Sequence, residues 1–289
     1  MRATPLHPRF GLEIHDVDLR HVTAEAGYPA IREAFETHSL LLFRGQQLDD
    51  EAHLAFGLLF GPIEDRSLGK YGDKPRMDNV TNLLPDGRVA PKDDSIMLNN
   101  IANQLWHTDS TFLPVPALAN ILAARVLSSR GGETEFASTR AAWRDLPEAL
   151  KARTRDAVLH HRLSYSRAKV SQKLATEENY TKWADQSWKA LWHNPVNGED
   201  ALFIASHAFA VEGLPEAEGQ ALIDQLIEFA TRPGTVHTHA WRPGDVLIWD
   251  ERAMLHRGRP WPYEEERTLA SICVSAQDVD GLNRMRPGT

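Results

Sequence analysis

Hydrophobic and polar residues follow two different periods along this chain, and the shorter period is the more common. Residues 11–19 alternate between apolar and polar side chains, which predicts an edge strand. Residues 39–45 form an apolar run that ends at a glycine, which predicts a buried strand. Further strands are expected at residues 119–127, 133–137, 160–165, 201–205, 236–241, 246–251 and 267–276.

The longer, helical period is confined to a few segments. Leu222, Ile223 and Leu226 recur at helical spacing within residues 215–231, which predicts the clearest helix of the chain. Other helices are expected at residues 31–38, 49–60 and 139–152. Strands predominate and helices flank them. The pattern therefore favours a mainly β fold, a double-stranded β-helix or jelly-roll barrel, in a single domain over residues 1–289.

Two segments lack a clear pattern. Residues 63–103 contain scattered glycine, proline and charged residues, and residues 166–190 are polar and in places basic. Long irregular segments inside a compact domain are usually functional or mobile. We therefore expect both segments to act as lids over a site.

Composition narrows the classes of partner. The chain has 289 residues, of which 42% are hydrophobic, and this is ample for a sizeable core. Its 32 basic and 40 acidic residues give a net charge of -8 without a long basic run, so nucleic acid and anionic membranes are poor partners. No stretch approaches the ~20 apolar residues of a membrane span. The single cysteine, Cys273, excludes an internal disulfide and agrees with a cytoplasmic location. A small-molecule partner is expected.

The candidate chemistry begins in the stretch Trp-His-Thr-Asp-Ser-Thr-Phe at residues 106–112. In an extended strand, His107 and Asp109 would point to the same face. One imidazole and one carboxylate supply two thirds of a 2-His-1-carboxylate site for Fe(II). His256 follows the apolar strand predicted at residues 246–251, and we expect it to be the third ligand. Taken alone, each histidine could equally be a structural residue held by local hydrogen bonds.

Arg267 opens the last predicted strand. A guanidinium that points into a barrel needs an anionic partner, because a buried unpaired charge is very costly. A dicarboxylate co-substrate would supply that partner with bidentate geometry. The alternative for this residue is a surface ion pair with Glu264 or Glu266.

At these residues the chain resembles the TauD/TfdA family of Fe(II)- and 2-oxoglutarate-dependent dioxygenases, most closely the aryloxyalkanoate (2,4-D type) enzymes. The resemblance covers nearly the whole chain and runs through the motifs GLEIHDVDLR, LLLFRGQ, FGLLFGPIE, NQLWHTDSTF, RGGETEF, GDVLIWDERAMLHRG and the arginine of EEERTL. It implies that His107, Asp109 and His256 bind iron, that Arg267 binds the distal carboxylate of 2-oxoglutarate, and that Thr134 assists it.

The resemblance also implies a reaction. Such an enzyme converts 2-oxoglutarate and O2 into succinate and CO2 and hydroxylates a small organic acid. If the hydroxylated carbon carries an ether oxygen, the product is a hemiacetal whose collapse cleaves the ether. Related halogenases have a small residue at the carboxylate position, so Asp109 indicates a hydroxylase. Family members often associate, which suggests a homo-oligomer.

One position departs from the family pattern. The 2,4-D and taurine enzymes carry a second arginine, four residues after the one that corresponds to Arg267, and it grips the substrate anion. Here that position is Ser271, which remains a candidate substrate contact. Candidate replacements in the predicted lids and beside them are Lys70, Arg162 and Arg167. Asn103 matches a position that contacts substrate in the taurine enzymes.

Other functions are compatible with the same residues. The substrate could be a taurine-like sulfonate or an N-acyl amino acid instead of an aryloxyalkanoate. In a different class, the same three ligands could hold Zn(II) in a hydrolase. A third class is a non-catalytic jelly-roll binding module. His237 and His239 share a predicted strand face, but no third partner for a second metal site is evident.

Overall fold

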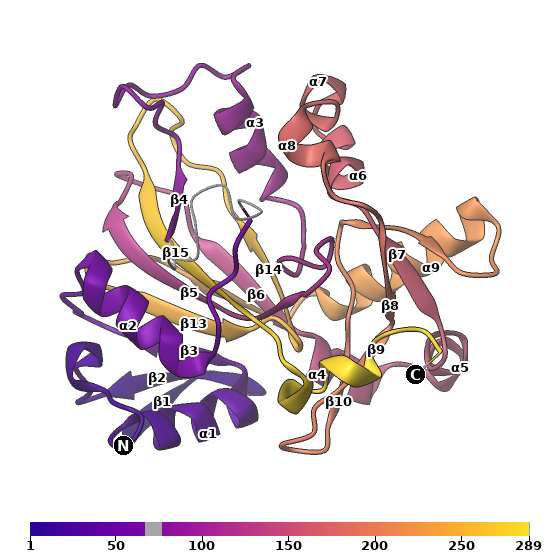
Figure 1. Ribbon diagram of the computed structural model, residues 1–289, viewed down its shortest axis with the longest axis horizontal. Helices are drawn as coiled ribbons and strands as arrows, with labels where there is room; N and C mark the ends of the chain where they lie inside the picture. Colours follow the sequence, from indigo (N-terminus) through magenta and orange to yellow (C-terminus); the bar gives the residue numbers. More distant parts are fainter. Residues whose placement is uncertain (67–76, 289) are drawn as a thin grey trace.

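The computed structural model describes residues 1–66 and 77–288, and two β-sheets dominate it (Figure 1). Within the described residues, the main sheet has the strand order β1 (Arg2–His7), β2 (Phe10–His15), β3 (Leu40–Phe43), β13 (Val246–Asp250), β5 (Ala117–Val126), β15 (Thr268–Ser275) and β4 (Asp78–Thr81). The second sheet has the order β12 (Val236–His239), β6 (Thr134–Ser138) and β14 (Met254–Gly258). Two short sheets lie beside them: β11 (Ala208–Val211), β7 (Val158–His161) and β8 (Gln186–Lys189), and β10 (Asp200–Leu202) with β9 (Leu191–His193).

The central strands of the main sheet are buried on both faces. In β13, Val246 and Ile248 belong to one hydrophobic core, whereas Leu247 and Trp249 belong to another that includes Phe136 of the second sheet. Successive side chains of a strand alternate between faces, so this division follows the period of two. It explains why these strands read as continuous apolar runs, since a strand covered on both faces needs no polar side.

Helices cover the outer faces of the two sheets. The first core includes residues of α1 (Tyr28–His38) and α2 (Asp50–Phe60), which pack on the main sheet (Figure 1). A third core joins Ala137 and Leu255 of the second sheet to α4 (Thr139–Asp145) and α9 (Glu216–Ala230). The predicted helix at residues 215–231 is confirmed, with the same apolar face buried. No helix in residues 1–66 or 77–288 has the length and apolar character needed to cross a membrane.

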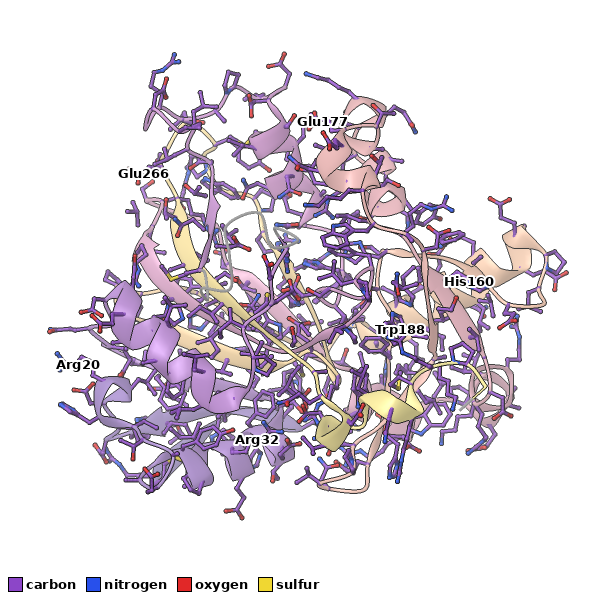
Figure 2. The ribbon with its side chains drawn as sticks, in the orientation of Figure 1. Arg20, Arg32, His160, Glu177, Trp188 and Glu266 are labelled. Atoms are coloured by element: carbon purple, nitrogen blue, oxygen red, sulfur yellow. The ribbon has the colours of Figure 1, made fainter. Side chains whose placement is uncertain are left out.

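The two segments predicted as lids are more regular than expected. Residues 63–103 contain β4 and α3 (Ser95–Ala102), and residues 166–190 contain parts of α6 (Leu163–Ala168), α7 (Gln172–Ala175), α8 (Glu178–Thr181) and β8. Helix α3 packs against α6 and α7 (Figure 1). The Ser95 hydroxyl donates to the carboxylate of Glu177, which Figure 2 shows beside these helices. Helices α3, α6, α7 and α8 therefore form one helical layer. Residues 67–76 of the first segment lie outside the described residues, and lid motion stays a prediction.

Several predicted boundaries are wrong for local reasons. The strand at residues 11–19 is not an edge strand, because β1 pairs outside it, and residues 19–21 form the short helix η1 (Leu19–His21). The predicted helix at residues 139–152 is two helices, α4 and α5 (Glu148–Thr154). Pro147 forces the preceding Leu146 into extended backbone and ends the first helix. The strand expected at residues 160–165 ends at His161, where α6 soon follows.

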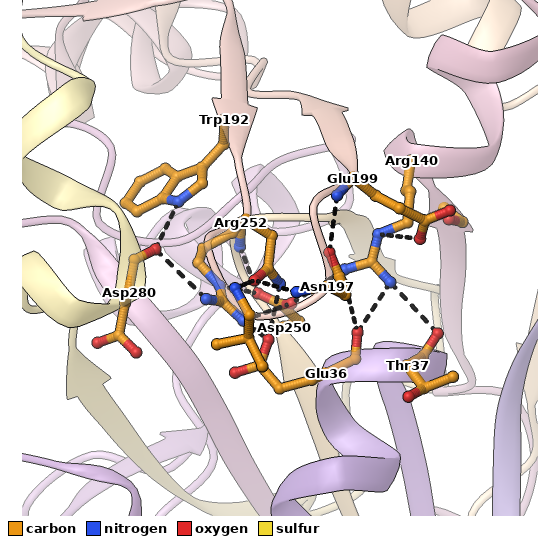
Figure 3. Close-up of polar contacts among 12 residues, drawn as sticks. Glu36, Thr37, Arg140, Trp192, Asn197, Glu199, Asp250, Arg252 and Asp280 are labelled. Carbon is orange, nitrogen blue, oxygen red and sulfur yellow. Dashed lines mark hydrogen bonds and ion pairs between the residues drawn. The ribbon is translucent and has the colours of Figure 1, made fainter.

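A buried group of charges ties the N-terminal helix to the turn between β13 and β14 (Figure 3). We call it the Arg252 cluster, and it consists of Arg32, Glu36, Arg140, Asp250, Arg252 and Asp280. The Arg252 guanidinium is 1% exposed and donates to Glu36 at 2.7 Å and to Asp250 at 2.8 Å. Asp280 belongs to the short helix η2 (Asp278–Asp280) near the C-terminus. The cluster therefore holds in place the turn from which the strand carrying His256 begins.

Candidate active site

His107 and His256 meet as a directly opposed antiparallel pair. The backbone N–H of His107 donates to the His256 carbonyl at 3.0 Å, and the reverse hydrogen bond is 2.9 Å long. The two ring centroids lie 4.2 Å apart. Opposed residues of an antiparallel pair point to the same side, so this pairing alone brings together two imidazoles that are far apart in the sequence. His256 lies within β14, which the sequence analysis did not predict as a strand.

The extended strand predicted at residues 106–112 is wrong beyond its start. Only His107 makes a β-bridge, and residues 109–112 form a turn. Ser110 has a φ of 60°, in the left-handed region that non-glycine residues rarely occupy. The turn still places Asp109 beside the histidines, with 3.5 Å from Oδ1 to His107 Nε2 and 3.8 Å from Oδ2 to His256 Nε2.

These three side chains fit a metal ion. One ligand atom from each of His107, Asp109 and His256 lies within 4.8 Å of the others, and the described part of the chain holds no other such group of three. The predicted ligand set is thus assembled in the form of a 2-His-1-carboxylate site, which suits Fe(II) and leaves positions open for small molecules. His237 and His239 form no second site among the described residues.

The protonation states also suit a metal. Burial lowers the pKa of His107 and lowers that of His256 to about 3, so both imidazoles are neutral near pH 7. Burial alone would raise the pKa of Asp109, but the neighbouring His256, His107 and Arg66 and a hydrogen bond from Asn120 hold it below its usual value. The Leu105 carbonyl accepts from His107 Nδ1 at 2.7 Å, which leaves the lone pair on Nε2. Metal binding requires these deprotonated ligands.

A set of neighbours that the sequence analysis missed holds Asp109. The Asn120 side-chain amide donates from Nδ2 to Asp109 Oδ2 at 2.7 Å, and the Ser271 hydroxyl donates to the side-chain Oδ1 of Asn120 at 2.9 Å. The Glu251 carboxyl accepts from the Asp109 backbone N–H at 2.9 Å. Asn120 is the one polar residue in the apolar run at 117–124, and that exception could have identified it. Ser271, predicted to contact substrate, thus also positions a metal ligand.

Two cavities adjoin the candidate ligands, one lined by all three and the other by His107 and Asp109. The smaller, about 80 Å³, is lined by Arg267, Thr134 and all three ligands. The Arg267 side chain is 5% exposed and donates from Nη2 to the Gly132 carbonyl at 2.8 Å. Its Nε is buried and has no hydrogen-bond partner in the part of the chain that the structure describes. Glu264 and Glu266 are exposed, and Figure 2 shows Glu266 at the outer edge, so the alternative surface ion pair is not formed.

The wall behind Arg267 depends on two glycines. Gly131 and Gly132 have φ values of 69° and 72°, and a Cβ on Gly132 would lie 2.7 Å from Arg267 Nε. Thr134 Oγ1 accepts from Trp241 Nε1 at 3.0 Å, so its own hydroxyl hydrogen remains able to donate. Burial lowers the pKa of Arg267 to about 10, and Glu133, which forms no ion pair with it, opposes this shift only in part. A carboxylate in this cavity would supply an ion-pair partner.

The larger cavity, about 410 Å³, lies over the other side of His107 and Asp109. Its walls come from the helical layer and from the inner face of the main sheet, and its lining includes Arg66, Asn99, Asn103, Phe112, Arg167, Tyr180, His207 and Ser271. Asn103 lines both cavities. Arg162 lies outside, in an exposed ion pair with Asp185. Lys70 is outside the described residues.

Comparisons with known proteins agree with this geometry. The family model described as "Taurine catabolism dioxygenase TauD, TfdA family" matches residues 2–273. The chain is 35% identical over 273 residues to an alpha-ketoglutarate-dependent 2,4-dichlorophenoxyacetate dioxygenase of Cupriavidus pinatubonensis, with 92% of this chain and 95% of the relative covered. It is also 35% identical to an (S)-phenoxypropionate/alpha-ketoglutarate-dioxygenase of Sphingobium herbicidovorans, over 92% of this chain and 91% of that protein.

A solved structure supports the fold in the same way. AAD-2 in complex with Mn(II) and N-oxalylglycine superposes with a TM-score of 0.89 at 32% identity, covering 96% of this chain and 98% of the other. The predicted mainly β jelly-roll class with flanking helices is therefore confirmed.

Proposed function

This chain belongs to the TauD/TfdA family of dioxygenases, and from that premise we propose that it hydroxylates an aryloxyalkanoic acid at the carbon bearing the ether oxygen. It is a 2-oxoglutarate-dependent non-haem iron dioxygenase, with Fe(II), 2-oxoglutarate and O2 as its cofactor and co-substrates. Hydroxylation at that carbon forms a hemiacetal, and its collapse releases a phenol and a carbonyl compound.

The observation that carries the proposal is that His107 and Asp109 line both cavities, while His256, beside them, lines the smaller one. One cavity presents a guanidinium and a hydroxyl, which suit the distal carboxylate of 2-oxoglutarate. The other is large enough for a small aromatic acid and includes Phe112, Val80 and Ile96 among its lining residues. A reaction between two bound molecules at one metal needs this arrangement.

The bound iron, with 2-oxoglutarate and O2, would supply the oxidising equivalents that insert one oxygen atom into a substrate C–H bond, the second oxygen leaving in succinate. In the proposed site, His107, Asp109 and His256 hold the metal. Arg267 and Thr134 orient the co-substrate through its distal carboxylate. Asn120 keeps Asp109 in place through its 2.7 Å hydrogen bond.

The substrate class is drawn from the named relatives, which act on 2,4-dichlorophenoxyacetate and on (S)-phenoxypropionate. Taurine-like sulfonates and N-acyl amino acids are the alternatives within the same chemistry. Because the chain belongs to a dioxygenase family, we no longer interpret it as a Zn hydrolase or as a non-catalytic binding module. We further propose that residues 1–289 form one catalytic domain, and that the enzyme is a cytoplasmic homo-oligomer without nucleic acid or membrane partners. We also propose that the described parts of residues 63–103, and residues 166–190, move as lids.

The test is succinate formation from 2-oxoglutarate with Fe(II), ascorbate and O2, across aryloxyacetates, aryloxypropionates, taurine and N-acyl amino acids. We expect aryloxyalkanoates to stimulate turnover and to release a phenol. His107→Ala should reduce turnover to background, whereas His193→Gln, at an exposed ion pair with Asp200, should leave it unchanged. Turnover retained by folded His107→Ala would refute the metal site, and stimulation by taurine or N-acyl amino acids alone would refute the substrate class.

A further inference from the structure

We propose that Arg167 holds the carboxylate of the substrate, and so takes over from helix α6 the part played in the 2,4-D and taurine enzymes by an arginine at the position of Ser271. The inference rests on the proposed function, because it names the group that recognises the acid in that reaction. It assigns substrate specificity to a residue on α6, which is far in the sequence from the position of Ser271 on β15.

Arg167 is a buried cation without an anionic partner among the described residues. The residue is 8% exposed, and its guanidinium forms no ion pair within 4.0 Å with a described carboxylate, although Asp109 of the same cavity acts on it from a greater distance. Nε donates to Asn99 Oδ1 at 3.1 Å, Nη1 to Ser166 Oγ at 3.0 Å, and Nη2 weakly to Asn103 Oδ1 at 3.4 Å. All three acceptors are neutral, so they orient the guanidinium but leave its charge uncompensated.

The local hydrogen bonds fix the direction of this side chain. The Ser166 hydroxyl donates to the Leu163 carbonyl at 2.9 Å, so its oxygen is left to accept from Arg167 and from His207 Nδ1, which lies 2.8 Å away. The guanidinium also lies 5.6 Å from the centre of the Tyr180 ring. Such a preorganised fork loses little entropy when it binds a carboxylate.

The place of the guanidinium is the substrate cavity. Arg167 lines the 410 Å³ cavity together with His107, Asp109 and Ser271. The other arginine in that lining, Arg66, is already engaged by Glu64 and also donates to Ser110 Oγ at 3.1 Å. The uncompensated positive charge in the described lining is therefore that of Arg167. An acid that enters this cavity meets the metal ligands and this charge at the same time.

Ser271 cannot supply the missing charge and has another use. Its hydroxyl is committed to Asn120, which in turn holds Asp109. A carboxylate drawn to α6 instead of β15 leaves that chain of hydrogen bonds intact. The chain thus lacks the family's arginine on β15 but carries a guanidinium without an ion pair on α6, at another wall of the same cavity. We infer that this guanidinium takes over the role of that arginine.

The experiment measures equilibrium binding of an aryloxyacetate and of its neutral methyl ester to the enzyme loaded with Mn(II) and N-oxalylglycine, alongside kcat and KM with Fe(II) and 2-oxoglutarate. Arg167→Gln should weaken binding of the acid and raise its KM about 10- to 100-fold, the range of a charge-assisted hydrogen bond. Binding of the ester and the KM for 2-oxoglutarate should change less than about twofold. Arg162→Gln, at the exposed pair with Asp185, is the matched control and should change nothing.

The outcomes separate the anchor from the reaction. If the affinity of Arg167→Gln for the acid is within twofold of wild type, Arg167 does not hold the substrate carboxylate. The same conclusion follows if the wild-type enzyme binds the ester as tightly as the acid. Arg167-dependent acid binding without aryloxyalkanoate turnover supports the anchor and overturns the proposed function. If Arg167→Gln does not fold, Arg167→Lys decides: it keeps the charge but loses the fork, and intermediate acid affinity with unchanged ester affinity is expected.

Discussion

The Arg252 cluster and the two cavities deal with buried arginines in opposite ways. Arg252 is 1% exposed and is surrounded by Glu36 and Asp250, so its charge is balanced within the fold. Arg167 and Arg267 are 8% and 5% exposed, yet their described hydrogen bonds go to neutral groups. Both of these line cavities that are also lined by proposed metal ligands, His107 and Asp109 in each case.

The difference separates charges that serve the fold from charges that serve a ligand. Removing water from a guanidinium costs several kcal/mol, and this cost persists unless an anion is supplied. In the Arg252 cluster the protein supplies that anion permanently. At Arg167 and Arg267 we propose that an arriving carboxylate supplies it, in which case part of the binding free energy of that carboxylate comes from relieving this cost. Burial of a charge therefore does not identify a site, whereas burial without a described counter-charge at a cavity does.

The largest expected effect comes from removing the central cation of the Arg252 cluster. Arg252→Met should lower the free energy of unfolding by about 3–5 kcal/mol, because Glu36 and Asp250 are left buried without their main cation. Urea denaturation followed by circular dichroism measures it. Arg162→Gln, which removes an exposed ion pair, should cost less than about 1 kcal/mol. Equal effects of the two substitutions would show that the cluster does not depend on Arg252.

At Arg267 we expect a smaller effect on stability than at Arg252, but a clear effect on binding of the co-substrate. Arg267→Gln should raise the KM for 2-oxoglutarate about 10- to 100-fold, since it removes a charge-assisted contact to the distal carboxylate. The ligand-free protein should lose little stability, because Arg267 forms no ion pair with a described acid and Glu133 acts on it only from a greater distance. Steady-state kinetics measure the KM, and thermal unfolding with and without Mn(II) and N-oxalylglycine measures the stability and its increase on ligand binding. An unchanged KM would place the co-substrate elsewhere.

The smallest expected effect is in the acid dependence of stability. Burial alone would raise the pKa of Glu36, but Arg252 and Arg32 outweigh it and hold the pKa below its usual value. A carboxylate with a lowered folded-state pKa stabilises the fold above its unfolded pKa of about 4.3, and this contribution is lost as the pH falls through the folded value.

The stability difference between wild type and Glu36→Gln should therefore narrow as the pH falls below about 4.3, measured by urea denaturation at each pH. Arg167→Gln, at a cation without an acidic partner in the described structure, should show no comparable narrowing. A difference that stays constant below pH 4 would contradict the assignment to Glu36.

The sequence by itself determined the central strands, the longest helix and the kinds of chemistry, but not the strand that carries His256. The apolar runs at β3 and β13 and the helical spacing in α9 are local patterns, because side-chain burial follows the period of the backbone. The spacing of His107 and Asp109, the position of His256 and the absence of a second arginine at Ser271 are also explicit in the chain. From these the family, the ligand types and the two-sheet fold followed.

Only the tertiary structure decided which groups meet. The turn at Ser110, the pairing of His107 with His256, and the support of Asp109 by Asn120 depend on strands brought together from distant parts of the chain. The same holds for Arg167, which in the sequence is one basic residue among several beside a polar segment. Whether a buried charge has a counter-charge depends on its neighbours in space. Packing brings those neighbours together from distant parts of the sequence, and a local sequence pattern does not record them.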